Sequence, residues 1–251
     1  MIPGRDVAAI ILAAGVGKRM RSDLAKVLHL ALGRPLLDYV LDAVQGVGAR
    51  RIIVVVGHQA EKVRSAVAGR GVEFVLQAEQ LGTGHAVRQA EPLLAGHEGD
   101  VLVLCGDTPA LSSRTLEELY ATHSRTGAAA TVLTAELDDP TGYGRVLRAP
   151  DGSVLRIVEH KDATPEERRE REINSGLFAF TARDLFAALS QVDADNAQEE
   201  YYLTDTLEIL RRMQRRVSAY RCVDRREVLG VNTLEQLREV ERFMAERVRG
   251  A

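Results

Sequence analysis

Short apolar segments alternate with amphipathic helical segments through the first 110 residues, and this alternation restricts the fold more than any other feature of the chain. Four segments have the length and the Val, Ile and Leu content of buried strands: residues 7–12, 51–57, 72–77 and 101–107. Three segments between them carry apolar residues at helical spacing: residues 35–48, 59–69 and 82–94. Strands and helices in this order predict a parallel sheet with helices on both faces.

The second half of the chain has a different pattern. Four shorter or alternating segments resemble strands: residues 128–137, 144–149, 153–159 and 173–180. Helices are expected over 201–216 and 232–250, and the charged run 161–173 is expected to be a solvated loop or short helix. We therefore expect an α/β fold with a Rossmann-like mixed, mainly parallel sheet. Residues 1–251 would form one domain, with a nucleotide-binding half (about 1–110) and a half that shapes a substrate pocket and carries the C-terminal helix (about 111–251).

Composition excludes several classes of function. Hydrophobic residues make up 45% of the chain, which allows a substantial core, whereas aromatic residues are only 4% and Trp is absent. Few aromatics and a net charge of -3 argue against nucleic-acid and membrane partners. No apolar run approaches the ~20 residues of a membrane helix, and the first six residues, MIPGRD, lack the apolar core of a signal peptide. The two cysteines show no metal-binding spacing, so we expect reduced thiols in a cytoplasmic protein.

The segment IILAAGVGKRM, residues 10–20, has the character of a phosphate-binding loop. It is not the dinucleotide pattern, because Met20 replaces the last glycine, and it is not Walker A, because Leu12 and Arg19 occupy required Gly and Ser/Thr positions. Gly15 and Gly17 nevertheless let main-chain N–H groups turn toward an anion. The following Lys18, Arg19 and Lys26 add positive charge. A plain strand-to-helix turn with surface charges is the alternative.

Asp107 and Asn232 are the candidate metal ligands. Asp107 follows the fourth strand, so it lies at the same carboxyl edge of the sheet as the glycine loop, where ligands of open α/β sheets bind. A carboxylate there suits magnesium held between protein and phosphates. The alternative for Asp107 is a cap on the next helix. Asn232 precedes the last helix, where it could cap that helix or offer a carbonyl oxygen to a metal.

Other polar residues at strand ends suit substrate binding. Gln77 presents a donor and an acceptor that match a pyrimidine edge, with Gly82 and Thr83 nearby in sequence; an ordinary surface position is the alternative for Gln77. Glu159 and Asn174 are polar groups suited to sugar hydroxyls or an amide. The lone histidines His58 and His85 have no metal partners in sequence, and we interpret both as structural.

These segments together resemble one enzyme family. The matching stretches are LAAGVGKRM, AKVLH, LQAEQLGTGHA, GDTP, DDPTGYGR, IVEHKDAT, EINSG, YYLTD and GVN, which run from about residue 7 to about residue 240. The chain resembles the N-terminal uridyltransferase domain of the bacterial bifunctional enzyme GlmU, N-acetylglucosamine-1-phosphate uridyltransferase. The first stretch is shared by many nucleotidyltransferases, whereas QAEQLGTGHA and VEHKDAT are far more specific.

The resemblance implies a fold of the nucleotide-diphospho-sugar transferase type and the conversion of UTP and N-acetylglucosamine 1-phosphate into UDP-N-acetylglucosamine and pyrophosphate, with Mg²⁺ as cofactor. It implies that Arg19 and Lys26 are catalytic, and that Asp107 and Asn232 hold the metal. The substrate-binding residues that it implies are Leu12, Ala13, Ala14, Gly15, Gln77, Gly82, Thr83, Gly106, Gly144, Glu159, Asn174 and Asn232.

The chain departs from the family pattern at three positions of the site. Val16 stands where a basic residue is usual and Lys18 where Thr is usual, so positive charge has moved two places along the loop. Cys105 replaces a common Tyr, which leaves the choice of sugar open. The sequence stops at Ala251 without the β-helix acetyltransferase domain, so neither acetyl transfer nor acetyl-CoA is expected. The remaining alternatives are transfer involving another sugar 1-phosphate or another base, and a non-catalytic UDP-sugar-binding protein.

Overall fold

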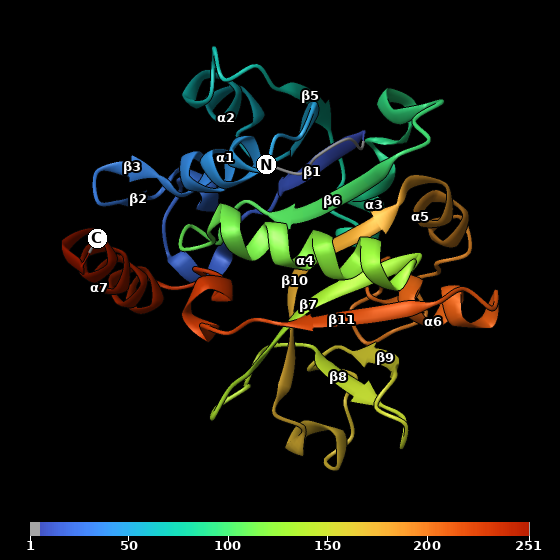
Figure 1. Cartoon of the computed structure of the whole chain (residues 1–251). Helices are drawn as coiled ribbons and strands as arrows, with labels where there is room; N and C mark the ends of the chain where they lie inside the picture. The colour runs from blue at the N-terminus through green and yellow to red at the C-terminus, as the bar shows by residue number, and fades with distance from the viewer. Residues whose placement is uncertain (1–5, 251) are drawn as a thin grey trace.

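The computed structural model describes residues 6–250, the side chain of Lys18 apart. Residues 1–5, part of the segment used above to argue against a signal peptide, lie outside the described residues. One nine-stranded sheet runs through both halves of the chain in the order β11-β7-β10-β6-β1-β4-β5, and β8 and β9 extend from β10 (Figure 1). Its strands are β1 Val7–Ala13, β4 Arg51–Val56, β5 Glu73–Leu76, β6 Asp100–Cys105, β7 Ala130–Glu136, β8 Arg145–Arg148, β9 Val154–Val158, β10 Glu172–Thr181 and β11 Val217–Arg221.

The mixed α/β sheet predicted from the sequence is confirmed. Strands β5, β4, β1 and β6 are parallel and come from the first half of the chain. Strand β10 joins β6 and β7 in antiparallel register, and β11 lies parallel to β7 at the edge. A separate small hairpin is formed by β2 Leu30–Ala31 and β3 Arg34–Pro35. The carboxyl ends of β1, β5 and β6 therefore meet at one edge of the sheet.

Helices cover both faces because the central strands are apolar on both sides. In β1, Ala9 and Ile11 belong to one core and Ala8 and Ile10 to the other, all fully buried. The helices on the first face are α1 Leu36–Gly46, α2 Ala60–Ala66 and α4 Ser113–Thr126; those on the second are α3 Thr83–Arg88, α5 Ala182–Leu189 and α6 Asp205–Arg212. No helix among residues 6–250 is both long and apolar enough to cross a lipid bilayer.

The last helix, α7 Leu234–Gly250, packs at the edge of the sheet beside the β2–β3 hairpin (Figure 1). Its apolar face, with Phe243 and Met244, forms a third core cluster with Met20, Ala110 and Val231. These three residues lie next to or near Arg19, Asp107 and Asn232 in sequence. The C-terminal helix thus supports the loops that carry Arg19, Asp107 and Asn232, although the chain order places it in the second half.

Several elements differ from the sequence-based expectations. The sequence analysis does not predict α4, α5 or β11. In α4 the buried apolar side chains form only a narrow stripe of Leu116, Leu119 and Tyr120 on an otherwise polar segment, which weakens the periodic signal. The helix expected over 82–94 ends at Arg88, and a 3₁₀ turn, Glu91–Leu94, follows with Pro92 near its start.

The helix expected over 201–216 is shorter and spans Asp205–Arg212. The charged run 161–173 is a mostly exposed loop with a short helical turn, as expected, except at its last two residues. Residues 201–204 lie outside α6 because their main chain pairs with residues 81–84. Most of residues 161–171 are exposed and contain one 3₁₀ turn, Glu167–Arg169. Glu172 and Ile173 instead begin β10 and are buried.

Candidate active site

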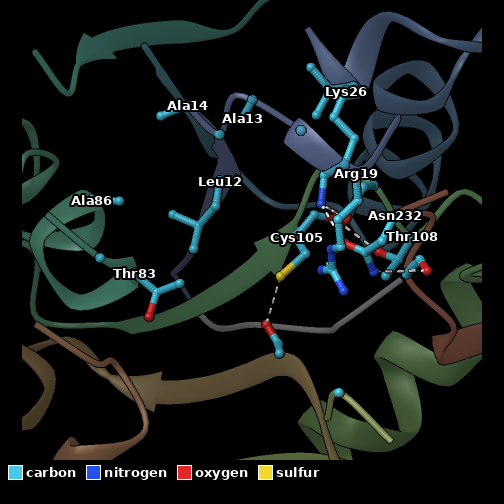
Figure 2. A pocket seen from close by; sticks show the side chains of 18 of the residues that line it. Leu12, Ala13, Ala14, Arg19, Lys26, Thr83, Ala86, Cys105, Thr108 and Asn232 are labelled. Carbon is cyan, nitrogen blue, oxygen red and sulfur yellow. Dashed lines mark hydrogen bonds and ion pairs between the residues drawn. The ribbon is translucent and has the colours of Figure 1, made fainter. Parts of the chain in front are cut away.

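A cavity of about 730 Å³ opens at the carboxyl edge of the parallel strands and receives side chains from both halves of the chain. Figure 2 shows Lys26, Arg19 and Asn232 together at one end of this cavity and Thr83 and Ala86 at the other, with Cys105 between them. The cavity brings together every predicted site residue except Gly106: Leu12, Ala13, Ala14, Gly15, Arg19, Lys26, Gln77, Gly82, Thr83, Asp107, Gly144, Glu159, Asn174 and Asn232.

One end of the cavity contains Arg19, Lys26, Asp107 and Asn232, and we call it the phosphate end after the predicted role of its glycine loop. There the loop places two cationic side chains against side-chain oxygens. Gly17 has φ +68°, and a Cβ there would lie 2.8 Å from Lys26 Cβ, so the loop backbone packs directly on the lysine stem. Lys26 Nζ forms an ion pair with the Asp107 carboxylate and donates to Asn232 Oδ1 at 3.1 Å. Arg19 donates to the same Asn232 oxygen at 2.9 Å. Arg19 is exposed and Lys26 is half-buried, and both line the cavity.

The carboxylate of Asp107 is not used as a helix cap. Helix α4 is capped by Ser112, whose hydroxyl accepts from the Thr115 N–H at 3.2 Å. The Glu227 carboxylate supports the same helix end by accepting from Ser112 N at 3.0 Å and from Thr115 Oγ1 at 2.7 Å. Asp107 is thereby left facing the cavity.

The side chain of Asn232 does not cap α7 either. The cap of α7 is Thr233, whose hydroxyl accepts from Gln236 N at 3.2 Å. Gln236 completes a capping box, since its Oε1 accepts from the main-chain N–H groups of Asn232 (2.8 Å) and Thr233 (3.2 Å). A main-chain bond from Val231 N to Asp107 O at 2.9 Å then fixes the two oxygen-bearing segments side by side.

Asp107 and Asn232 fit a hard divalent cation by the chemistry of their donors. Both offer oxygen, and magnesium commonly takes one or two protein oxygens together with phosphate oxygens and water. Over the described residues, no group of three or more His, Cys, Asp or Glu side chains is placed to hold a metal alone. A cation at this edge would therefore depend on ligands supplied by the substrate.

At the other end of the cavity, Gln77 is buried, with 3% of its surface exposed, so it is not an ordinary surface residue. Its amide nitrogen donates to Gly82 O at 3.1 Å and lies 3.0 Å from His85 Nδ1. These contacts fix the orientation of the amide, and Oε1 is bonded to no other side chain or main-chain group that the structure describes. His85 thus orients Gln77, a role that the sequence analysis missed. The signal in the sequence was the spacing of eight residues between Gln77, just after the strand, and His85 in the following helix.

The stretch around Gly82 interlocks with the YYLTD stretch. Gly82 has φ +106°, and a Cβ there would lie 2.7 Å from Tyr201 O, so only glycine fits. Gly84 N donates to Tyr201 O at 2.7 Å, and the Thr83 hydroxyl accepts from Leu203 N at 3.0 Å. The second half of the chain therefore closes directly onto the loop that holds Gln77.

Glu159, Asn174 and Gly144 form a third group on the side of the second half. A Cβ on Gly144 would lie 3.3 Å from Glu159 Oε1, and Asn174 N donates to Gly144 O at 2.9 Å. Burial raises the pKa of the Glu159 carboxyl, and the nearby Asp162 and Glu200 raise it further, against a hydrogen bond from Thr204 that lowers it. This group of residues thus includes a carboxyl, that of Glu159, whose charged form is disfavoured by its surroundings.

Cys105 lies in the cavity as a protonated thiol. Burial raises the pKa of Cys105 to about 12, and the negative Asp107 adds to the shift. A Cβ on Gly176 would lie 2.8 Å from Cys105 Sγ, so the thiol packs against a bare backbone. Tyr143, a half-buried residue of the lining, was not foreseen; burial and Asp107 raise its pKa. Neither group is a nucleophile near neutral pH.

Gly106 is the one predicted site residue outside the cavity lining. Its N–H donates to Leu12 O at 2.9 Å, and a Cβ would lie 3.1 Å from both that oxygen and Val27 Cγ1. Its small size allows β6 to pack against β1, which places Asp107. A direct contact of Gly106 with substrate stays a prediction.

Sheet, glycine loop and paired charges define a nucleotidyltransferase-like class, and a family model supports the same assignment. The model described as "MobA-like NTP transferase domain" matches residues 9–207, so the chain belongs to this family. A solved structure of UDP-glucose pyrophosphorylase complexed with UDP-glucose has a TM-score of 0.76 at 18% identity, with 96% of this chain and 99% of that chain covered. At this identity the likeness shows the fold alone, and it confirms the predicted fold type.

Curated relatives that share about half of their aligned residues with this chain are GlmU proteins. The bifunctional protein GlmU of Lactobacillus delbrueckii subsp. bulgaricus is 54% identical over 239 residues, which cover 95% of this chain and 52% of that protein. GlmU of Pelotomaculum thermopropionicum is 52% identical over 243 residues, covering 97% of this chain and 53% of that protein. The chain thus spans about half the length of the curated relatives that it matches, and the resemblance to GlmU is confirmed.

Proposed function

We propose that the protein transfers a uridylyl group from UTP to N-acetylglucosamine 1-phosphate, giving UDP-N-acetylglucosamine and pyrophosphate. The observation that carries this proposal is one cavity with Arg19, Lys26, Asp107 and Asn232 at one end and the fixed Gln77 amide, bonded to Gly82, at the other. The similarity to GlmU proteins at 52–54% identity supports it.

The reaction needs positioning and charge neutralisation more than covalent catalysis. An oxygen of the sugar phosphate attacks the α-phosphorus of UTP in line, the bond to the β-phosphate oxygen breaks, and pyrophosphate leaves with its negative charge. Arg19 and Lys26 stabilise the charge on the transferring and leaving phosphates. A divalent cation, Mg²⁺ in this proposal, would be held by Asp107 and Asn232 and would supply further neutralisation of phosphate charge.

The Gln77 amide supports uridine as the base. Its nitrogen is engaged by Gly82 and His85, so the free Oε1 presents an acceptor to the cavity. Uracil carries an N3–H donor that matches this acceptor, whereas the N3 of cytosine is itself an acceptor. A pocket that leaves an acceptor facing an acceptor is strongly disfavoured.

Two measurements test the proposal. Mass spectrometry of the product formed from UTP, N-acetylglucosamine 1-phosphate and Mg²⁺ should detect UDP-N-acetylglucosamine. Gln77→Ala should lower the ratio of kcat/KM for UTP over CTP by roughly 10–100-fold, because one discriminating hydrogen bond is worth about 1–3 kcal/mol. The exposed Glu79→Gln is the matched control and should leave the ratio unchanged. An unchanged ratio in Gln77→Ala would contradict this role of Gln77.

One observation keeps a second sugar in consideration. Cys105 lines the same cavity as Asn174, at the position where the family commonly carries the larger Tyr. The candidate is therefore uridylyl transfer to another sugar 1-phosphate, with the same phosphate chemistry.

We propose a cytoplasmic location, which the two free thiols, Cys105 and Cys222, support.

A further inference from the structure

The two oxygen ligands proposed for the metal already have cationic partners within the protein. The Asp107 carboxylate is paired with the Lys26 ammonium, and Asn232 Oδ1 accepts from both Lys26 and Arg19. The cluster joins the segment of Arg19 and Lys26 to Asp107 and to Asn232, which lie far from it in sequence, so the arrangement is a built feature of the fold.

Lys26 is held firmly in this position. Its stem is covered by the Gly17 backbone, and its neighbours Val27 and Leu28 are buried in the core beneath the loop. The paired groups are mostly shielded from water, with 20% of the Lys26 side chain and 10% of the Asp107 side chain exposed. Charges shielded in this way are poorly screened by salt, so the ammonium and a divalent cation would repel each other strongly at the same carboxylate.

We propose that Lys26 is the counter-ion of the divalent-metal site in the free protein, and that the metal enters together with the nucleoside triphosphate. The triphosphate offers Lys26 and Arg19 a stronger anionic partner than Asp107 and Asn232. The ammonium then moves to the phosphates, and Asp107 and Asn232 become available to the metal. This inference rests on the proposed function, since it takes Asp107 and Asn232 as metal ligands.

Binding of Mn²⁺ to the full chain, measured by the loss of the free Mn²⁺ signal in electron paramagnetic resonance, tests this exchange. The protein without nucleotide should bind Mn²⁺ weakly, and Lys26→Met should bind it more tightly by roughly 10–100-fold, because one adjacent positive charge is removed. The double variant Lys26→Met with Asp107→Asn should lose this gain. Lys62→Met, on the exposed surface of α2, changes the net charge equally and should bind Mn²⁺ like the unmodified protein.

Equal Mn²⁺ affinity in Lys26→Met and Lys62→Met would overturn the inference, and so would tight Mn²⁺ binding to the unmodified protein without nucleotide. Lys26→Gln, checked for folding by circular dichroism, serves where the methionine variant does not fold. A further titration with a non-hydrolysable UTP analogue separates the two proposals. If the analogue binds but brings no Mn²⁺ with it, the metal site of the proposed function is wrong. If Mn²⁺ binds only with the analogue and Lys26→Met changes nothing, the counter-ion inference alone fails.

Discussion

The two ends of the cavity treat charge in opposite ways. At the phosphate end, the carboxylate of Asp107 meets Lys26, and the carbonyl of Asn232 meets Lys26 and Arg19. In the third group, which is formed by Gly144, Glu159 and Asn174 and is here called the sugar end after the proposed function, Glu159 forms no ion pair within the part of the chain that the structure describes. The acids Asp162 and Glu200 lie near enough to raise the pKa of Glu159. In the proposed function, the first end would meet phosphates, whose charge changes during transfer, and the second would meet the neutral hydroxyl and amide groups of the sugar.

This difference predicts which kinetic constant each end of the cavity affects in the proposed reaction. Charged partners at the phosphate end act on groups whose charge changes during transfer, so their loss should appear in turnover. Uncharged or weakly charged partners at the sugar end bind ground state and transition state alike, so their loss should appear in substrate affinity. Three substitutions at the cavity test this division, and a fourth, at Asp205, tests how the nearby acidic groups affect stability.

Asp107→Asn should lower kcat by roughly 10²–10⁴-fold, as is typical when a group that stabilises transition-state charge is lost. The substitution removes both the proposed metal ligand and the partner of Lys26. Steady-state rates of pyrophosphate release with Mg²⁺ provide the measurement, and thermal unfolding should stay cooperative. Near-normal turnover in this variant would place the metal elsewhere.

Arg19→Ala should lower kcat by roughly 10²-fold, while the Kd for the UDP-sugar product changes much less. The reason is that the help of the guanidinium grows as charge develops on the leaving pyrophosphate. Stopped-flow rates and isothermal titration of the UDP-sugar give the two quantities. Equal losses in rate and binding would mean that Arg19 contacts phosphate without favouring the transition state.

Glu159→Gln should raise KM for the sugar 1-phosphate by roughly tenfold and leave KM for UTP nearly unchanged, since one polar contact at a binding site is worth about 1 kcal/mol. The exposed Glu170→Gln is the matched control, because it removes the same charge from the surface. A fall in kcat at constant KM would show that the sugar end also acts on the transition state, and the division between the two ends would fail.

Asp205→Asn should stabilise the protein at pH 8 but not at pH 4. Burial raises the pKa of Asp205 from 3.8 to about 6, and Glu159 contributes to the shift. A carboxyl with a raised pKa contributes full stability below about pH 3.8 and loses that contribution as the pH rises toward 6. The amide avoids this loss, so Tm should rise by roughly 2–4 °C at pH 8 and the gain should vanish near pH 4. An equal gain at both pH values would exclude the ionisation of the buried Asp205 carboxyl as the cause.

Much of the site could be predicted from the sequence because parallel strands bring their carboxyl ends to one edge. That rule alone places the glycine loop, Gln77 and Asp107 near each other. Glu159 and Asn174 could be named as polar residues at strand ends, the resemblance strengthened both, and the cavity contains them. Whether each of these residues contacts substrate stays a prediction.

Other features depend on contacts between distant segments, which sequence patterns do not encode. Asn232 satisfies the rule for a helix cap, yet Thr233 performs that role through a capping box with Gln236. The function of His85 arises only because α3 turns its imidazole toward Gln77. The apolar face of α7 is visible in sequence, but its packing beneath Met20 and Val231 is not.

The most direct test of the account is a grid of pyrophosphate release with Mg²⁺. UTP, CTP, GTP and dTTP would each be paired with the 1-phosphates of N-acetylglucosamine, N-acetylgalactosamine and glucose. The account predicts fast release with UTP and N-acetylglucosamine 1-phosphate and far slower release with every other pair. Fast release with UTP and a different sugar would keep the phosphate chemistry and contradict the sugar assignment. Absence of release with every pair, alongside tight binding of a UDP-sugar, would contradict the central claim that this cavity catalyses uridylyl transfer.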